Sequence, residues 1–197
     1  MGLKTGEDVL THVHLPGVQK PEDLKRLIDD LRYESGGVPI GVKIGAGTIS
    51  LEKDMDIIVS SGVDFITIDG STAATKGSPP ILQDDFGIPS LLAIPRAVQF
   101  LESRGVKGKV DIIASGKLLT PGDYLKAIAL GASAVYSGTS ALLAVSHRQT
   151  EKLLPWEPPG TIIWYTGAKA NTYDVKLGAR SLANYLNSVR MEMMDGL

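Results

Sequence analysis

The sequence predicts an α/β fold: a parallel (β/α) barrel of the TIM type, in which only about half of the eight units are present. Two observations predict it. A unit of helix, glycine, short apolar strand and glycine-containing loop recurs along the chain, most clearly at residues 62–70 and 131–138. Strands that alternate with helices in this way pair in parallel. The number of such units is about half of what a closed barrel needs.

Short runs of β-branched and apolar residues predict the strands. The first glycine of each repeated unit suits the left-handed position that ends a helix, so the strand begins directly after it. Four strands are predicted, at residues 40–44, 65–69, 110–114 and 134–137, and residues 9–14 are interpreted as the remnant of a fifth.

The helices between the strands are predicted from the residues that start and stop them. Pro21 opens the first helix, and the carboxylates of Glu22 and Asp23 suit the positive end of its dipole. The other expected signals are Ser50 and Gly62 at the ends of the second helix, Pro95 in the first turn of a third at residues 94–103, and Thr120, Pro121 and Asp123 at the start of the fourth.

The pattern changes after residue 145. The chain is interpreted as one partial domain, residues 1–197, in which residues 146–197 form an irregular C-terminal extension and a closing helix. Several prolines and a glycine between residues 155 and 160 mark the irregular part. Residues 161–165 are expected to be either one extra strand or a cover over the barrel end, and residues 184–194 to be the closing helix.

Composition excludes several classes of function. A net charge of −2, with basic residues spread along the chain, argues against a nucleic-acid partner. No apolar run approaches the length that spans a membrane, and the N-terminus lacks the apolar core of a signal peptide, so a cytoplasmic protein is expected. The absence of cysteine excludes iron–sulfur clusters and disulfides within the chain. His12 and His14 can share one face of a strand and hold a metal, but with no third ligand nearby a polar strand edge is favoured.

Two glycine turns at predicted strand ends are candidates for a phosphate site. They are Ser115-Gly116-Lys117 and Ser137-Gly138-Thr139. Each places a glycine where backbone N–H groups can approach an anion, beside hydroxyl groups that can donate to phosphate oxygens. Late loops of this form bind phosphate in many such barrels, although strand-to-helix turns also favour glycine and serine without any ligand.

Lys43 and Asp69 are the candidate catalytic residues. Lys43 lies in an apolar strand, where an ammonium group needs an anionic or carbonyl partner: either a ligand or Asp69 at the end of the next strand. Asp69 is expected to act as a polar anchor or a proton-handling group, or simply to cap the loop that follows, and Gly70 beside it is a candidate ligand contact. Residues 73–80 are expected to form a ligand-covering loop or a plain connection, and Arg96 to reach an anionic substrate or to be solvated.

In order and spacing these motifs resemble the FMN-binding domain of the glutamate synthase family over roughly residues 10–145. The landmarks are VPIGVKIG at residues 38–45, FITIDG at 65–70, GIP at 87–89 and GKLLTPGD at 116–123. The resemblance implies an FMN-dependent oxidoreductase that reduces 2-iminoglutarate, formed from 2-oxoglutarate and ammonia, to glutamate. It implies that Lys43 contacts the flavin and that the Gly116 and Gly138 turns bind its phosphate.

The chain departs from the family pattern in three places. Ala73-Ala74-Thr75-Lys76 replaces a Gly-Gly-Thr-Gly run, Ser146-His147-Arg148-Gln149 stands where cysteine ligands of an iron–sulfur cluster are expected, and the first half of the barrel is missing. The alternatives are therefore a non-catalytic half-barrel or assembly subunit that keeps a phosphate site, and a relative of inosine monophosphate dehydrogenase, which the missing cysteine disfavours.

Half a barrel leaves strand edges and one side of its core uncovered. We therefore expect a homo-oligomer, or a partner that supplies the missing half, together with a small anionic substrate.

Overall fold

The computed structural model describes residues 15–73, 78–157 and 159–197 of the chain. Residues 9–14, interpreted from the sequence as a fifth strand, lie outside this part, as do His12 and His14. The described barrel units comprise α1 (Pro21–Glu34), β1 (Gly41–Gly45), α2 (Leu51–Ser60), β2 (Phe65–Asp69), α4 (Ser90–Ser103), β3 (Asp111–Ser115), α5 (Pro121–Ala129) and β4 (Ala134–Val135). A short helix, α3 (Pro80–Asp84), lies between β2 and α4.

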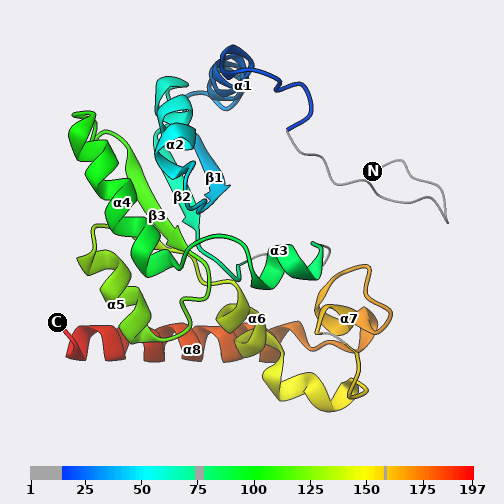
Figure 1. Cartoon of the computed structure of the whole chain (residues 1–197). Helices are drawn as coiled ribbons and strands as arrows, with labels where there is room; N and C mark the ends of the chain where they lie inside the picture. Colours follow the sequence, from blue (N-terminus) through cyan, green and yellow to red (C-terminus); the bar gives the residue numbers. More distant parts are fainter. Residues whose placement is uncertain (1–14, 74–77, 158) are drawn as a thin grey trace.

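The four strands form one parallel sheet in the order β1-β2-β3-β4, as the sequence predicts (Figure 1). Gly45, Asp69 and Ser115 are partners in the register, so the carboxyl ends of the first three strands are level. The fourth strand is shorter than the predicted residues 134–137. It ends at Val135, and Gly138 directly precedes the next helix.

Helices cover one face of this sheet. Ile66, Ile68, Ile112 and Ala114 point to that face and are almost fully buried. They belong to one core cluster with apolar residues of the helices, among them Leu51 and Met55 of α2 and Ala93, Ile94 and Ala97 of α4. Figure 1 shows α2 and α4 on the same side of the sheet. This winding, with strands in sequence order and helices on one face, is that of a partial (β/α) barrel.

The opposite face of the sheet corresponds to the interior of a barrel. Because side chains alternate along a strand, Lys43, Thr67 and Ile113 share this face and are partners in the register. Near the amino ends of the strands the Phe65 ring occupies the space beside Gly41, where an added Cβ would lie 2.1 Å from the ring. Phe65 thus fills the end of this face that is remote from the strand carboxyl ends.

Two predicted helix starts are confirmed in atomic detail. Pro21 is the first residue of α1, and the Asp23 carboxylate accepts the backbone N–H groups of Gln19 and Lys20 at 3.1 and 3.2 Å. At α5, the Thr120 hydroxyl accepts the Asp123 N–H, and the Asp123 carboxylate accepts the Thr120 N–H. Such capping boxes satisfy backbone donors that the first helical turn leaves without partners.

The predicted start of the third helix at residue 94 is wrong. The helix, α4, begins at Ser90 and Pro89 precedes it, so Pro95 lies inside the helix rather than in its first turn. A proline at that position has no N–H to give to the Leu91 carbonyl, but the helix continues to Ser103. The start signal was assigned to the wrong proline.

The C-terminal extension is mostly helical. After α6 (Thr139–Ser146), it contains the 3-10 helix η1 (His147–Lys152), α7 (Gly160–Ile163), the 3-10 helix η2 (Ala170–Thr172) and α8 (Val175–Asp195). Residues 161–165 therefore do not form the strand that was one of the two expectations; α7 buries Ile162 instead. The closing helix is longer than residues 184–194 because the Asp174 side chain caps it, accepting the Leu177 N–H at 3.0 Å. None of the described helices is both long enough and apolar enough to cross a membrane.

The Asp123 cap leads to a prediction about acid stability. Hydrogen bonds from backbone N–H groups, above all that of Thr120, lower the pKa of the Asp123 carboxyl. A lowered folded-state pKa contributes stability above the unfolded-state pKa, which is about 3.9 for aspartate. That contribution is lost as the pH falls through the folded-state value.

Asp123→Asn is therefore expected to be less stable than the parent at pH 7, with a difference that shrinks as the pH falls below about 4. Thermal unfolding between pH 7 and pH 2.5 measures it. Asp29→Asn, in an exposed pair with Lys25 on α1, is the control, because such pairs add little stability. A difference for Asp123→Asn that stays constant over this range would contradict the assignment.

Candidate functional site

The loops that follow the strands meet at one edge of the sheet. The predicted phosphate turns, at residues 115–117 and 137–139, are neighbours there, because the Tyr136 N–H donates to the Ala114 carbonyl at 2.9 Å and continues the pairing of β3 with β4. The loop after β2 adjoins them, since the Gly70 N–H donates to the Ser115 carbonyl at 3.1 Å, and the loop after β1 adjoins that of β2, since the Ala46 N–H donates to the Asp69 carbonyl at 2.8 Å. The sequence-predicted residues of this edge are therefore brought together.

Lys43 and Asp69 form an ion pair on the inner face of the sheet. The Lys43 Nζ lies 3.0 Å from the Asp69 Oδ2, which is the protein partner considered from the sequence. The Lys43 side chain is nevertheless 60% exposed, whereas that of Asp69 is 16% exposed. Ion pairs with an exposed member contribute at most about 1 kcal/mol. The ammonium group can therefore turn to an anionic ligand at little energetic cost.

Gly70, Ser90 and Gly116 form a tight junction between the ends of β2 and β3. The Gly70 N–H donates to the Ser115 carbonyl at 3.1 Å, and the Ser90 hydroxyl lies 2.6 Å from that same oxygen and 2.7 Å from the Gly116 carbonyl. A Cβ on Gly116 would lie 2.6 Å from the Gly70 nitrogen. These two glycines allow the loops to touch each other, and the Gly70 N–H has a protein partner; contact of Gly70 with a cofactor stays a prediction.

The turn at residues 137–139 is more open than the turn at 115–117. A Cβ on Gly138 would meet no atom within 4 Å, and Gly138 and Thr139 are exposed. Across from it, Lys117 is also exposed and has a positive φ of 48°. Lys117, Gly138 and Thr139 are thus the solvent-accessible residues of the two predicted phosphate turns.

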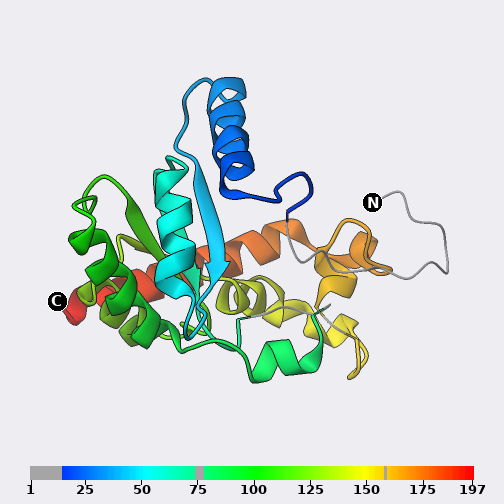
Figure 2. The same ribbon diagram turned by 45° about the horizontal axis from the view of Figure 1, so that its top comes forward.

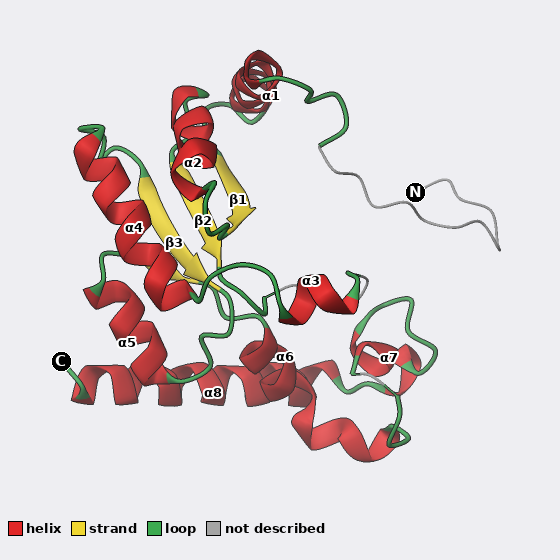
Figure 3. Cartoon of the chain, in the orientation of Figure 1, coloured by secondary structure: helices red, strands yellow, loops and turns green. Residues whose placement is uncertain are grey.

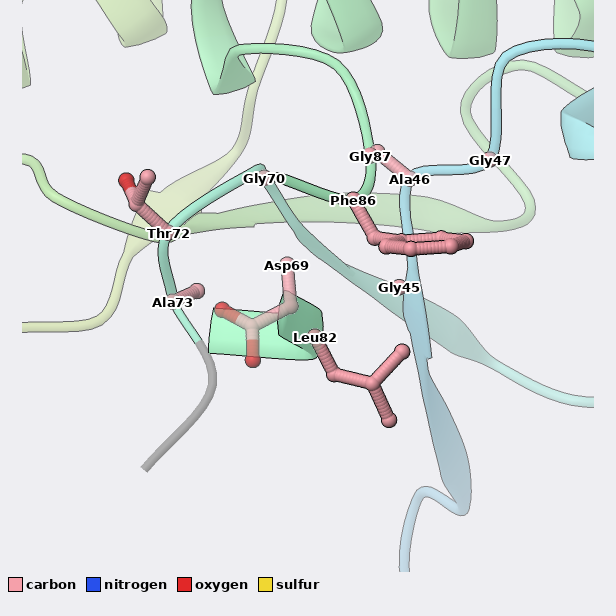
Figure 4. Close-up of a pocket in the computed structure, with 10 residues that line it drawn as sticks. All are labelled: Gly45, Ala46, Gly47, Asp69, Gly70, Thr72, Ala73, Leu82, Phe86 and Gly87. Atoms are coloured by element: carbon pink, nitrogen blue, oxygen red, sulfur yellow. The ribbon is translucent and has the colours of Figure 1, made fainter. Parts of the chain in front are cut away.

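A pocket of about 310 Å³ opens beside Asp69 (Figure 4). Its inner wall is the backbone at the ends of β1 and β2, and its outer wall includes Leu82 of α3 and Phe86. The backbone of Ile88, two residues after Phe86, fixes this wall to the strand ends. Its N–H donates to the Ala46 carbonyl at 2.9 Å, and its carbonyl accepts the Ser71 N–H at 2.8 Å. Residues 74–77 of the expected ligand-covering loop lie outside the described residues.

Sequence reasoning missed Leu82, Phe86 and Ser90. The apolar pair Ile81-Leu82 directly after Pro79-Pro80 could have indicated a short helix that packs on the sheet edge. No periodic pattern can identify a helix of five residues, because it has little more than one turn.

Arg96 does not reach the site, and it is not simply solvated. Its guanidinium group holds the Glu52 carboxylate through two bonds of 2.8 and 2.7 Å and donates to the Thr48 carbonyl at 3.0 Å. This bidentate contact lowers the pKa of the Glu52 carboxyl. Arg96 joins α4 to the start of α2 and is a structural residue. Among the described residues there is no cluster of side chains suited to a metal ion.

Comparison with known proteins gives the family. Residues 2–196 match the model described as the conserved region in glutamate synthase. The chain belongs to the glutamate synthase family. Within it, the chain is 32% identical over 196 residues to an archaeal-type glutamate synthase [NADPH] of Dehalococcoides mccartyi, covering 99% of this chain and 39% of that protein. An archaeal glutamate synthase [NADPH] of Archaeoglobus fulgidus is 37% identical over 149 residues, which are 73% of this chain and 28% of that protein.

The glutamate synthase relatives are much longer than this chain, which spans about two fifths of the length of the Dehalococcoides protein. Among solved structures, a flavocytochrome b2 mutant with benzoylformate is 23% identical, with a TM-score of 0.48, over 64% of this chain and 28% of that chain. Similarity at this level assigns no function.

Proposed function

We propose that this chain forms the half of the (β/α) barrel that binds the FMN phosphate in an FMN-dependent glutamate synthase, an enzyme that reduces 2-iminoglutarate to glutamate. One observation carries the proposal: the turns at residues 115–117 and 137–139 are neighbours at one edge of a parallel sheet whose inner face also presents Lys43. In (β/α) barrels, phosphate groups bind to loops at this edge. Membership of the glutamate synthase family supports the choice of FMN.

The residues at the edge suit the two parts of FMN. The exposed Lys117 and the open turn of Ser137, Gly138 and Thr139 would hold its phosphate. The flavin ring would lie toward Lys43, whose cation suits the electron-rich N1/O2 side of such a ring. Bound FMN supplies a carrier for two electrons, so that a hydride can be delivered to the imine carbon of the substrate.

Lys43 and Asp69 would then serve the substrate. Reduction of 2-iminoglutarate adds a hydride to carbon and a proton to nitrogen, and an external reductant must replace the two electrons. The Asp69 carboxylate lies 3.0 Å from the Lys43 ammonium at the strand end and would relay a proton from solvent to the imine nitrogen. The Lys43 ammonium would attract the dianionic substrate to the same place.

Replacement of Lys43 by methionine tests the proposal. A charge-assisted contact contributes about 1.5–3 kcal/mol, so Lys43→Met is expected to bind FMN roughly ten- to a hundredfold more weakly. Quenching of flavin fluorescence on titration measures the dissociation constant. The matched control is Lys25→Met, an exposed lysine on α1, which should bind like the parent. A parent chain that leaves flavin fluorescence unchanged would refute FMN binding, and equal binding and equal flavin reduction potential in Lys43→Met would remove Lys43 from its role.

The second candidate is a non-catalytic half-barrel or assembly subunit. It is favoured by the Lys43–Asp69 contact, which gives both charges a protein partner, and by the two edge strands, β1 and β4, each paired on one side only within the described residues. We propose that a second copy or a separate polypeptide covers this inner face. Sedimentation velocity over a hundredfold range of concentration tests it: a well-folded monomer throughout would count against a self-associating subunit.

A further inference from the structure

Three hydroxyl groups from distant parts of the chain form a row behind the open turn. Tyr124 of α5 donates from its Oη to the Ser137 Oγ at 3.0 Å. On its other side the Tyr124 Oη lies 3.5 Å from the Oη of Tyr185, which belongs to α8. The Tyr124 side chain is only 5% exposed, so its hydroxyl needs protein partners.

One bond of this row has a defined direction, and a consistent arrangement of the other protons follows from it. A hydroxyl group has one proton to give, and Tyr124 gives its proton to Ser137. The proton of Tyr185 can then fill the acceptor position on Tyr124. Ser137 already accepts a bond, so its own proton points elsewhere. In the part of the chain that the structure describes, no acceptor for this proton is found.

The row also connects the turn to the C-terminal helix. Helix α8 packs against α5 and α6; Figure 1 shows it passing below them, and in Figure 2 it is the long orange-to-red helix that runs behind β1. Residue 138 directly precedes α6, so the open turn is held between α5, which supplies Tyr124, and α8, which supplies Tyr185. A tyrosine hydroxyl is already protonated at neutral pH and can donate, and burial raises the pKa of Tyr124 further.

We propose that Tyr124 and Tyr185 are positioning residues, which aim the Ser137 hydroxyl as a donor at a phosphate monoester bound to the turn of residues 137–139. The inference rests on the proposed function and deepens it, because it makes recognition of the phosphate depend on the docking of α8.

Comparison of FMN with riboflavin isolates the effect, because riboflavin has the same ring and no phosphate. A misdirected neutral hydrogen bond costs about 0.5–1.5 kcal/mol, so Tyr124→Phe is expected to weaken FMN binding about three- to tenfold and to leave riboflavin binding unchanged. Tyr185→Phe should give a smaller loss of the same kind. Ser137→Ala should also weaken FMN binding and leave riboflavin binding unchanged. The double variant Ser137→Ala/Tyr124→Phe should bind FMN as Ser137→Ala does, because Tyr124 acts only through Ser137.

Tyr173→Phe is the matched control. The Tyr173 hydroxyl donates to the Val145 carbonyl at 2.8 Å and so also joins the C-terminal segment to α6, but it has no part in the row. Its removal should leave the ratio of FMN to riboflavin affinity unchanged. If Tyr124→Phe fails to fold, judged by circular dichroism, Tyr185→Phe and Ser137→Ala report the same ratio.

The outcomes separate the two proposals. If the parent prefers FMN over riboflavin but none of the three variants changes that ratio, the positioning role is refuted and FMN binding stands. If the parent binds inorganic phosphate but no flavin, and Tyr124→Phe weakens the phosphate, the flavin proposal fails and the positioning role stands. A parent that binds inorganic phosphate no better than chloride, and FMN no better than riboflavin, refutes the positioning role outright.

Discussion

Gly116→Ala is expected to lower the free energy of unfolding by about 3 kcal/mol. Gly116 has a φ of +97°, a conformation that alanine adopts only with strain of about 1–3 kcal/mol. The added methyl group would also lie 2.6 Å from the Gly70 nitrogen. That atom belongs to the backbone and donates to the Ser115 carbonyl, so it cannot move aside without breaking the junction between β2 and β3. Urea denaturation followed by circular dichroism measures the loss.

Gly138→Ala, in the neighbouring turn, is the control. Its φ is −98° and an added Cβ would meet no atom within 4 Å, so we expect a change within about 1 kcal/mol. Equal unfolding midpoints for the two variants would show that the tight junction is not what makes Gly116 necessary.

Gln149→Leu is expected to destabilise the docking of α8 by about 3 kcal/mol. Gln149 is 1% exposed, and its amide bridges the backbone of Asp174, the residue that caps α8. The Gln149 Nε2 donates to the Asp174 carbonyl at 2.9 Å, and its Oε1 accepts the Asp174 N–H at 2.8 Å. Leucine removes both of these bonds and the one that the Lys152 ammonium donates to the Gln149 Oε1 at 2.8 Å, each worth about 0.5–1.5 kcal/mol. Hydrogen exchange should therefore accelerate in α8 before it does in β2.

Gln99→Leu makes the same chemical change at an exposed position on α4, and it should alter the unfolding free energy by less than about 0.5 kcal/mol. Uniform acceleration of exchange in β2 and α8 of Gln149→Leu would mean that the two regions unfold only together.

Local signals predicted the barrel units well, because each signal acts within a few residues. Figure 3 shows the alternation of strands and helices that the sequence predicts. The strand at residues 65–69 has the predicted bounds, and the caps at Pro21 and Thr120 are where the sequence places them. Errors arose where two signals competed, as with Pro89 and Pro95 in α4, or where the element was as short as α7.

The site was predictable in position and less so in detail. The glycine turns and Lys43 follow from strand ends, which any parallel sheet brings to one edge. The partner of Lys43 is 26 residues away, and the sequence left a ligand and Asp69 as alternatives. Tyr124 and Tyr185 are 61 residues apart, on helices whose packing no local pattern specifies. Contacts of this kind depend on tertiary packing.

The pocket beside Asp69 has walls of two different kinds. Its inner wall is backbone at the ends of the sheet, whereas Leu82 and Phe86 of its outer wall are 44% and 58% exposed and lie outside the core cluster. Substitutions at exposed positions rarely change stability by more than about 0.5 kcal/mol. Substitutions in the α3 segment can therefore change the shape of this pocket while the scaffold that bears it stays intact.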